Sequence, residues 1–240
     1  MIENVPKQLP VMVITGTSRG LGYGIANYFL NHGYYVIGCS RGISAIQHEN
    51  YKHSQIDVSD ERQVQGWVRH IKRTTSGIDV LVCSAGVLNS FTHMSLTSGL
   101  LLNSFLNINI AGTFYVCREV SKAMLLRRSG SIITISSIMT QLHEPGTSGY
   151  SASKSAITEM TKVLAKEIAP MNINCNVIAP SFMITDATNS FSEEWADALI
   201  EKQTIKRAVT IPEVCNIISF FAAPESRCVT GQVIYMGLVC

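Results

Sequence analysis

The sequence predicts an α/β fold with a single doubly wound parallel sheet flanked by helices. Short apolar runs rich in β-branched residues recur along the chain, and longer stretches with helical spacing separate them. Strands that alternate with helices in this way pair in parallel through right-handed crossovers. The composition agrees, because 46% hydrophobic and 15% charged residues suit a sheet that is buried on both faces.

The elements follow from the same patterns in chain order. We expect strands at 11–15, 34–39, 79–83, 131–135, 173–178 and 232–236, with a short further strand before Asp57. The stretch from Tyr150 to Pro170 is predicted to be a helix, since its apolar residues recur three or four positions apart. Residues 1–240 are expected to form one domain. Only about 181–210 lacks a clear strand or helix, and its late position suggests a substrate lid.

Composition excludes several classes of protein. No run reaches the roughly 18 apolar residues of a membrane span, and the first ten residues do not resemble a secretory signal. Lys and Arg number 19 against 17 Asp and Glu, which gives no reason to expect nucleic acid or an anionic membrane as a partner. The cysteines are scattered, without CxxC or zinc-type spacing. We therefore expect a cytoplasmic protein with free, buried thiols.

A glycine-rich stretch, TGTSRGLG, follows the first strand directly. Its glycines are Gly16, Gly20 and Gly22, and a helix is expected from about Leu21. Glycines at such a turn let the backbone approach a pyrophosphate, whose charge then lies at the helix N-terminus. A simple tight turn would use the same residues. The position between the first strand and a helix favours dinucleotide binding.

The end of the second strand indicates which coenzyme would bind. An acidic residue there would bind the ribose 2′-hydroxyl of NAD(H), whereas arginine accommodates the 2′-phosphate of NADP(H). This chain has Ser40 and Arg41 instead of an acid, and Arg19 in the glycine turn adds a second cation. NADP(H) is therefore predicted, although Arg41 could be an ordinary surface arginine. Asp57 is placed to accept a hydrogen bond from the adenine amine, or to form a turn or helix cap.

The stretch YSASK places Tyr150 and Lys154 four residues apart at the start of the predicted helix. Side chains at this spacing share one helix face, and an ammonium group close to a phenol lowers its pKa. The pair could thus act as an acid or base. In isolation, it could equally be an exposed tyrosine and a solvated lysine.

Together, these features resemble the short-chain dehydrogenase/reductase family over about residues 10 to 237. The family's TGxxxGxG motif is TGTSRGLG here, and its YxxxK motif is Tyr150 and Lys154. Its active-site serine, about 13 residues before the tyrosine, falls on Ser137, and its central-helix asparagine matches Asn109 better than Asn107. The resemblance implies a Rossmann fold that holds NADP(H).

The resemblance also implies the chemistry. Hydride transfer from the coenzyme would reduce a ketone to a secondary alcohol. Tyr150 would donate the proton and Ser137 would hold the carbonyl oxygen. Lys154 would lower the pKa of Tyr150 and bind the nicotinamide ribose, while Asn109 would anchor a water that links the lysine to solvent.

The coenzyme contacts that the resemblance implies follow the strand ends. They are Gly16, Ser18, Arg19, Gly20, Leu21, Gly22, Ser40, Arg41, Asp57, Val58, Ser84, Ala85, Gly86, Tyr150, Lys154, Pro180, Met183 and Thr185. Two departures from the family pattern accompany them. Cys83 and Ser84 replace two asparagines of the family's NNAG, and Ser181 replaces the glycine of its PG. Neither departure removes a catalytic group.

The substrate is less sharply predicted. The chain most resembles β-ketoacyl carrier-protein reductases, in which basic residues matching Arg127 and Arg128 bind an acidic carrier. A solvated basic helix end would look the same.

The main alternative is a sugar or small polar ketone, whose hydroxyls would be bound by His143, Glu144 and Thr147. A catalytically silent NADP(H)-binding scaffold is disfavoured, because all four catalytic residues are present. The family resemblance implies a homo-oligomer, either a tetramer or a dimer.

Overall fold

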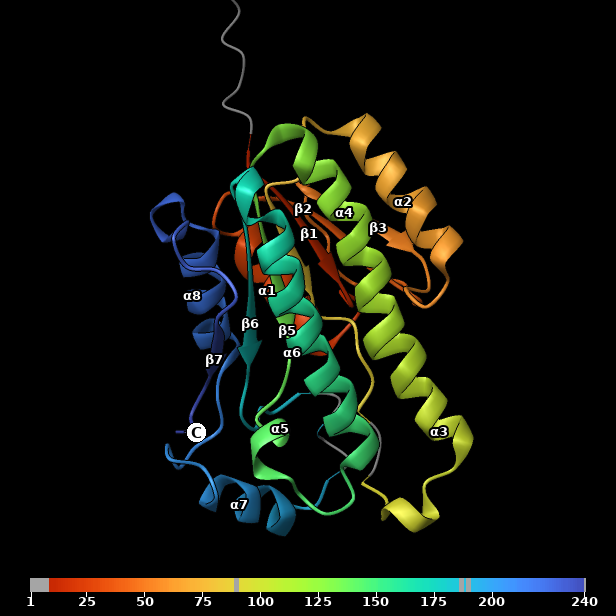
Figure 1. The fold of residues 1–240 in the computed structure, drawn as a ribbon, viewed down its shortest axis with the longest axis vertical. Coiled ribbons are helices and arrows are strands. Elements are labelled where there is room, and N and C mark those ends of the chain that lie inside the picture. The colour runs from red at the N-terminus through yellow and green to blue at the C-terminus, as the bar shows by residue number, and fades with distance from the viewer. Residues whose placement is uncertain (1–8, 89–90, 186–187, 189–190, 240) are drawn as a thin grey trace, which may run out of the picture.

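The computed structural model describes residues 9–88, 91–185, 188 and 191–239. Its centre is a seven-stranded sheet in the order β3-β2-β1-β4-β5-β6-β7, and every neighbouring pair is parallel (Figure 1). The strands are β1 Val11–Thr15, β2 Tyr35–Ser40, β3 Tyr51–Gln55, β4 Val80–Cys83, β5 Gly130–Ile135, β6 Ile173–Ala179 and β7 Val233–Tyr235. The predicted doubly wound parallel sheet is confirmed, and the strand ranges differ from those expected by about one residue at each end.

Helices cover both faces of the sheet (Figure 1). One face carries α1 (Gly20–Leu30) and α8 (Ile211–Ala222), and the other carries α2 (Glu61–Thr74), α4 (Thr113–Arg127) and α6 (Ser148–Ile168). Alternate residues of each strand serve the two sides. In β1, Val11 and Val13 pack with residues of α2, α4 and α6, whereas Met12 and Ile14 pack with those of α1 and α8. Burial on both faces explains why the strands are continuous apolar runs.

One long helical segment changes its winding in the middle. It consists of α3 (Gly99–Ser104), the π-helical stretch η2 (Phe105–Gly112) and α4. By length and composition, Gly99–Arg127 would suffice to cross a membrane. Here its inner residues, such as Val116, Val120 and Met124, are buried against the sheet. Its apolar character therefore has a structural role in the core.

Short elements complete the chain. They are η1 (Met94–Leu96), α5 (Met139–Leu142), η3 (Ala169–Met171), α7 (Glu193–Glu201) and η4 (Pro224–Ser226). The segment of about 181–210, in which the sequence showed no clear strand or helix, contains α7. Ser192 caps this helix by accepting a hydrogen bond from the Trp195 N–H, and Glu193 and Glu194 lie in its first turn. Residues 186–187 and 189–190 of the expected lid lie outside the described residues.

Six cysteines of the described chain are free. Five are buried, namely Cys39, Cys83, Cys117, Cys175 and Cys215, while Cys228 is exposed. The expectation of buried thiols therefore holds for five of the six, and Cys240 lies outside the described residues.

Candidate active site

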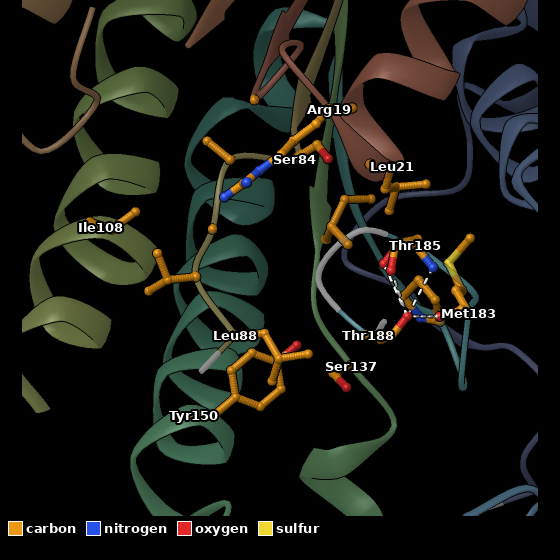
Figure 2. A pocket seen from close by; sticks show the side chains of 18 of the residues that line it. Arg19, Leu21, Ser84, Leu88, Ile108, Ser137, Tyr150, Met183, Thr185 and Thr188 are labelled. Atoms are coloured by element: carbon orange, nitrogen blue, oxygen red, sulfur yellow. Dashed lines mark hydrogen bonds between the residues drawn. The ribbon is translucent and has the colours of Figure 1, made fainter. Parts of the chain in front are cut away.

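A cleft of about 920 Å³ opens beyond the carboxyl ends of the strands. The segments that follow β1 to β6 all contribute to its wall, which is where parallel α/β sheets bind ligands. Every residue predicted to contact a coenzyme lines this cleft, and so do Ser137, Tyr150 and Lys154. Figure 2 shows Arg19 and Ser84 toward one end, with Ser137 and Tyr150 toward the other.

The glycine turn is shaped by close backbone contacts. Gly16 and Gly20 have φ angles of +81° and +61°, which favour glycine. A Cβ atom on Gly22 would overlap the carbonyl oxygen of Gly16, and one on Gly16 would lie 2.9 Å from the Cα of Ala85. Because α1 begins at Gly20, the N–H groups of its first turn lie at the cleft. The turn can therefore bring backbone donors to an anion.

Lys154 is buried at the inner end of the cleft. Its side chain is 7% exposed, and its Nζ donates a 2.8 Å hydrogen bond to the carbonyl oxygen of Ile135. Burial lowers the pKa of Lys154 to about 8. The Nζ atom lies 5.8 Å from the centroid of the Tyr150 ring, so the two side chains share one face of α6 as the spacing predicted.

The pKa of Tyr150 differs from the prediction in direction. Burial raises it to about 12, and hydrogen bonding with Ser137 offsets only part of that effect. The expected lowering by Lys154 is thus not found, because the ammonium group is directed at Ile135 and desolvation dominates. Tyr150 is consequently a protonated acid at neutral pH, able to donate its proton.

Asn109 lies behind the cleft, not in its wall. It is fully buried within the π-helical stretch η2, a distortion that often occurs at functional sites. Its Oδ1 accepts from the Val87 N–H at 2.8 Å, while its Nδ2 donates to the Val87 carbonyl and to Ser153 Oγ. Ser153 in turn donates to the carbonyl of Tyr150. Asn109 therefore ties the loop after β4 to α6 through its side chain, and its role in anchoring a water stays a prediction.

The opposite end of the cleft carries positive charge. The exposed Arg19 and Arg41 both line it, from the glycine turn and from the end of β2. Asp57 also lines the cleft, but its Oδ1 accepts hydrogen bonds from both the N–H and the hydroxyl of Ser59. The turn interpretation of Asp57 is therefore correct, and it leaves the residue in reach of a ligand.

The loop after β4, which has Cys83 and Ser84 in place of the family's two asparagines, is hydrogen-bonded to Thr15. The Thr15 hydroxyl accepts from the backbone N–H groups of Ser84 and Ala85, at 3.1 and 2.9 Å. These bonds do not depend on asparagine side chains. The replacements at 83 and 84 thus leave the loop against the cleft.

Comparison with known proteins agrees with this geometry. A family model described as enoyl-(acyl carrier protein) reductase matches residues 16–237. The chain belongs to the short-chain dehydrogenase/reductase family. It is an oxidoreductase with the Rossmann fold of that family.

Curated relatives in this family share about a third of its residues. The chain is 33% identical over 232 residues to the 3-oxoacyl-(acyl-carrier-protein) reductase FabG of Chlamydia muridarum, with 92% of this chain and 93% of the relative covered. It is 30% identical over 234 residues to FabG of Buchnera aphidicola, covering 95% of each.

Solved structures superpose closely. ElxO with NADP bound has a TM-score of 0.88 at 29% identity, covering 95% of this chain and 97% of that one. Ligand-free aldohexose dehydrogenase of Thermoplasma acidophilum has a TM-score of 0.88 at 27% identity, covering 96% of this chain and 94% of that one.

An aromatic cluster at the Tyr150 end of the cleft was missed by the sequence analysis. Phe91, Phe191 and Trp195 pack with ring centroids 4.5 to 4.9 Å apart, and Phe91 and Trp195 line the cleft. Phe191 and Trp195 belong to the predicted lid, whose aromatic residues were the available signal. Phe91 comes from the loop after β4, a contact that sequence spacing does not reveal.

The residues expected to bind sugar hydroxyls do not reach the cleft. None of His143, Glu144 and Thr147 lines it. Glu144 forms an ion pair with Lys202 at 2.7 Å, and the Thr147 hydroxyl donates to the Glu144 carbonyl. The side chains of Glu144 and Thr147 are therefore engaged within the protein, and the expectation that these three residues contact substrate hydroxyls is wrong for this cleft.

The two arginines considered for carrier binding lie at the other end of the sheet. Arg127 pairs with Asp79 at 3.1 Å, just before β4 begins, and Arg128 donates to the carbonyl of Pro170. Both precede β5, whereas the cleft lies beyond its carboxyl end. A carrier bound to these arginines would be remote from the cleft of the same chain.

Proposed function

We propose that this member of the short-chain dehydrogenase/reductase family is an NADP(H)-dependent reductase that converts a ketone to a secondary alcohol. The observation that carries the proposal is the convergence of Ser137, Tyr150 and Lys154 in the cleft that the glycine turn and Arg41 also line. ElxO, which superposes on this chain, was solved with NADP bound.

The residues present fit this coenzyme. The glycine turn lines the cleft at the start of α1, with open space where a Cβ of Gly20 would stand, and two arginines line the end of the cleft that would hold the 2′-phosphate. When bound, NADPH supplies the hydride. Lys154, which lines the cleft, would hold a ribose hydroxyl with its ammonium group, and Thr185 and Met183 line the wall after β6.

The chain's own residues would manage the carbonyl oxygen. Negative charge develops on that oxygen during reduction, so hydrogen-bond and proton donors stabilise the transition state. Ser137 would donate a hydrogen bond and Tyr150 the proton. Since burial raises the pKa of Tyr150 to about 12, the residue holds its proton throughout the physiological range. Tyr150 therefore carries the proton that reduction of a carbonyl requires.

The walls around Tyr150 favour a substrate with an apolar body. Leu88, Met139 and Leu199 line the cleft together with Phe91 and Trp195, and Figure 2 shows Leu88 and Tyr150 toward the same end of the cleft. Such walls suit an acyl chain or a hydrocarbon ring, because burying each CH₂ contributes about 0.8 kcal/mol. A 3-oxoacyl thioester, the substrate type named for the FabG relatives, is thus preferred to a sugar ketone.

The position of Arg127 and Arg128 bears on where a carrier protein could dock. Because Arg127 and Arg128 lie at the far end of the sheet, a carrier docked there would serve the cleft of another subunit. We propose a cytoplasmic homo-oligomer, a dimer or tetramer. Its support is the exposed apolar surface of the long helices, including Leu102, Leu106 and Phe114.

A panel of ketones with NADPH, followed by loss of NADPH absorbance, tests the function. The panel should contain short and medium 3-oxoacyl thioesters, a cyclic hydrocarbon ketone and a sugar ketone. We expect kcat/KM to rise about fourfold with each added methylene that the cleft can bury. Activity confined to the sugar would support the polar-ketone alternative. Coenzyme binding without turnover on any ketone would support a silent scaffold.

The contact between the aromatic residues of the cleft wall, Phe91 and Trp195, and the substrate can be tested by mutation. Trp195→Ala should raise KM for the apolar ketones, because it removes a ring that lines the cleft. Phe220→Ala removes a half-exposed aromatic side chain of α8 that is outside the cleft wall, so it should leave the kinetics unchanged. Equal effects of both changes would contradict the assignment of this wall to the substrate.

A further inference from the structure

A chain of polar side chains lies beneath the carboxyl end of β2. The Tyr51 hydroxyl hydrogen-bonds Thr17 Oγ1 at 2.8 Å and His53 Nδ1 at 2.9 Å. On the other side of the imidazole, Nε2 lies 2.9 Å from the Gly42 carbonyl oxygen and 3.1 Å from Ser40 Oγ. His53 thus connects a buried pair of hydroxyls to the turn that follows β2.

The fold makes room for this network at Gly38. A Cβ atom there would overlap Thr17 Oγ1 and lie 2.5 Å from the Tyr51 hydroxyl. Tyr51 and Thr17 are 7% and 0% exposed, so each hydroxyl relies on its protein partners. The network is therefore a built feature of strands β2 and β3 and the glycine turn.

The position of His53 relates it to the charged end of the cleft. Ser40, Arg41 and Gly42 line the cleft, whereas His53 stands behind them outside its wall. Ser40 is further fixed by donating its hydroxyl to the Gly42 carbonyl at 2.8 Å. Through Ser40 and Gly42, His53 holds the short segment that carries Arg41.

The hydrogen-bond partners permit two protonation states of the ring. The Gly42 carbonyl can only accept, so Nε2 carries a proton in both states. Nδ1 faces the Tyr51 hydroxyl, which can either donate to it or accept from it. The neutral ring and the imidazolium therefore hold the same turn, but only the second adds a positive charge behind Ser40. Histidine side chains ordinarily change charge between pH 5 and 8.

We propose that His53 is a positioning residue for the coenzyme's 2′-phosphate, and that its protonation strengthens binding of that phosphate. This inference rests on the proposed use of NADP(H). By linkage, binding of the negatively charged phosphate would favour protonation of His53, and protonation of His53 would raise the affinity for the phosphate by the same factor. Binding of NADP(H), but not of NAD(H), would then be coupled to a proton on His53.

The other ionisable groups around His53 fit this role. Arg19 and Arg41 supply permanent positive charge in the cleft, and Lys52 extends from the same strand as His53. Asp57 is the one carboxylate among the described residues that line the cleft. Burial raises the pKa of Tyr51 and that of Cys39 in β2, so both remain uncharged at neutral pH. His53 is thus the imidazole of this network, and its charge depends on whether Nδ1 carries a proton beside the Tyr51 hydroxyl.

Fragments of the coenzyme test the inference without any turnover. The probes are 2′,5′-ADP, which carries the 2′-phosphate, and 5′-AMP, which lacks it, with Kd measured by calorimetry at pH 6 and pH 8.5. His53→Gln keeps a donor for Gly42 but cannot titrate. We expect it to bind 2′,5′-ADP about fivefold more weakly than wild type at pH 6, and about equally at pH 8.5. Affinity for 5′-AMP should match wild type at both pH values.

Two further variants sharpen the result. His53→Ala removes the donor as well, so it should weaken 2′,5′-ADP binding at both pH values. His48→Gln makes the same change at a histidine outside the cleft wall, whose Nδ1 accepts from the Asn50 N–H, and should change nothing. A loss for His53→Gln that is equal at both pH values, or equal for both probes, would overturn the proposed proton coupling.

The outcomes also separate this inference from the proposed function. Wild-type protein that binds both probes equally would refute the NADP(H) assignment and this inference with it. Wild-type protein that prefers 2′,5′-ADP, with His53→Gln indistinguishable from it at pH 6, would overturn the role of His53 and leave the coenzyme assignment intact.

Discussion

Replacing Lys154 with methionine should stabilise the protein while abolishing its function. The side chain is 7% exposed, and burial lowers its pKa from 10.5 to about 8. Keeping this charge inside the fold costs about 3 kcal/mol at neutral pH. Lys154→Met removes that cost but leaves the Ile135 carbonyl without its donor, which costs about 1 kcal/mol. The expected net gain is about 2 kcal/mol in the free energy of unfolding.

The gain should depend on pH in a defined direction. Below pH 8, Lys154 is protonated in both the folded and the unfolded wild-type chain, so the full cost is present. Between about pH 8 and 10.5, the unfolded chain binds more protons than the folded one, and wild-type stability rises with pH. The advantage of the methionine variant should therefore shrink over this window, pass through zero near about pH 9.5, and leave the variant about 1 kcal/mol less stable by about pH 10.5, because the lost hydrogen bond to Ile135 remains.

Urea unfolding and thermal melts of the coenzyme-free proteins at pH 7 and pH 10, at one protein concentration, measure both effects. The variant's Tm at pH 7 should be about 4–8 °C higher. Lys162→Met is the matched control on the same helix, because Lys162 is exposed and pairs with Glu159 on the surface. It should change stability by less than about 0.5 kcal/mol. A Lys154→Met protein that is less stable than wild type at pH 7, or whose difference is independent of pH, would refute this account of the buried ammonium.

Two other predictions concern the coenzyme end of the cleft. Wild-type protein should bind NADPH about ten- to a hundredfold more tightly than NADH. The double variant Ser40→Asp with Arg41→Ala should reverse this preference, because the new carboxylate repels the 2′-phosphate. Equal affinities of the wild-type protein for the two coenzymes, measured by calorimetric titration, would contradict the proposed contact between Arg41 and the 2′-phosphate. Gly22→Ala should cost about 1–3 kcal/mol and weaken coenzyme binding, because its Cβ would overlap the Gly16 carbonyl. Gly66→Ala, in the middle of α2 with open space around it, should instead stabilise by about 1 kcal/mol in the same melt, and a destabilised Gly66→Ala would show that the steric argument is not specific.

The sheet was predictable because its strands are buried on both faces. A strand such as β1, with Val13 facing one helix layer and Ile14 the other, must be apolar throughout, and that pattern is visible in the sequence. The glycine turn was equally visible, since Gly16 and Gly22 meet a local backbone requirement. The family resemblance then implied that Ser137 and Tyr150 share one site, and both line the cleft.

The features that sequence reasoning missed depend on contacts between distant segments. The spacing of Tyr150 and Lys154 gave their proximity but not the direction of the Tyr150 pKa, which follows from burial and from the partner that Lys154 finds in Ile135. The sequence did not reveal that Arg127, considered for binding an acidic carrier protein, forms an ion pair with Asp79. The packing of Phe91 on Trp195 joins the loop after β4 to α7, about a hundred residues further along the chain.

The role of Tyr150 as proton donor is the central claim, and turnover of Tyr150→Phe tests it most directly. The measurement is kcat with NADPH and the best ketone of the panel, together with the Kd for NADPH. Tyr28→Phe, the same change on α1 outside the cleft wall, is the control. The account predicts that Tyr150→Phe binds NADPH within about twofold of wild type and loses at least about a hundredfold in kcat. A variant that binds NADPH normally and retains most of its kcat would contradict it.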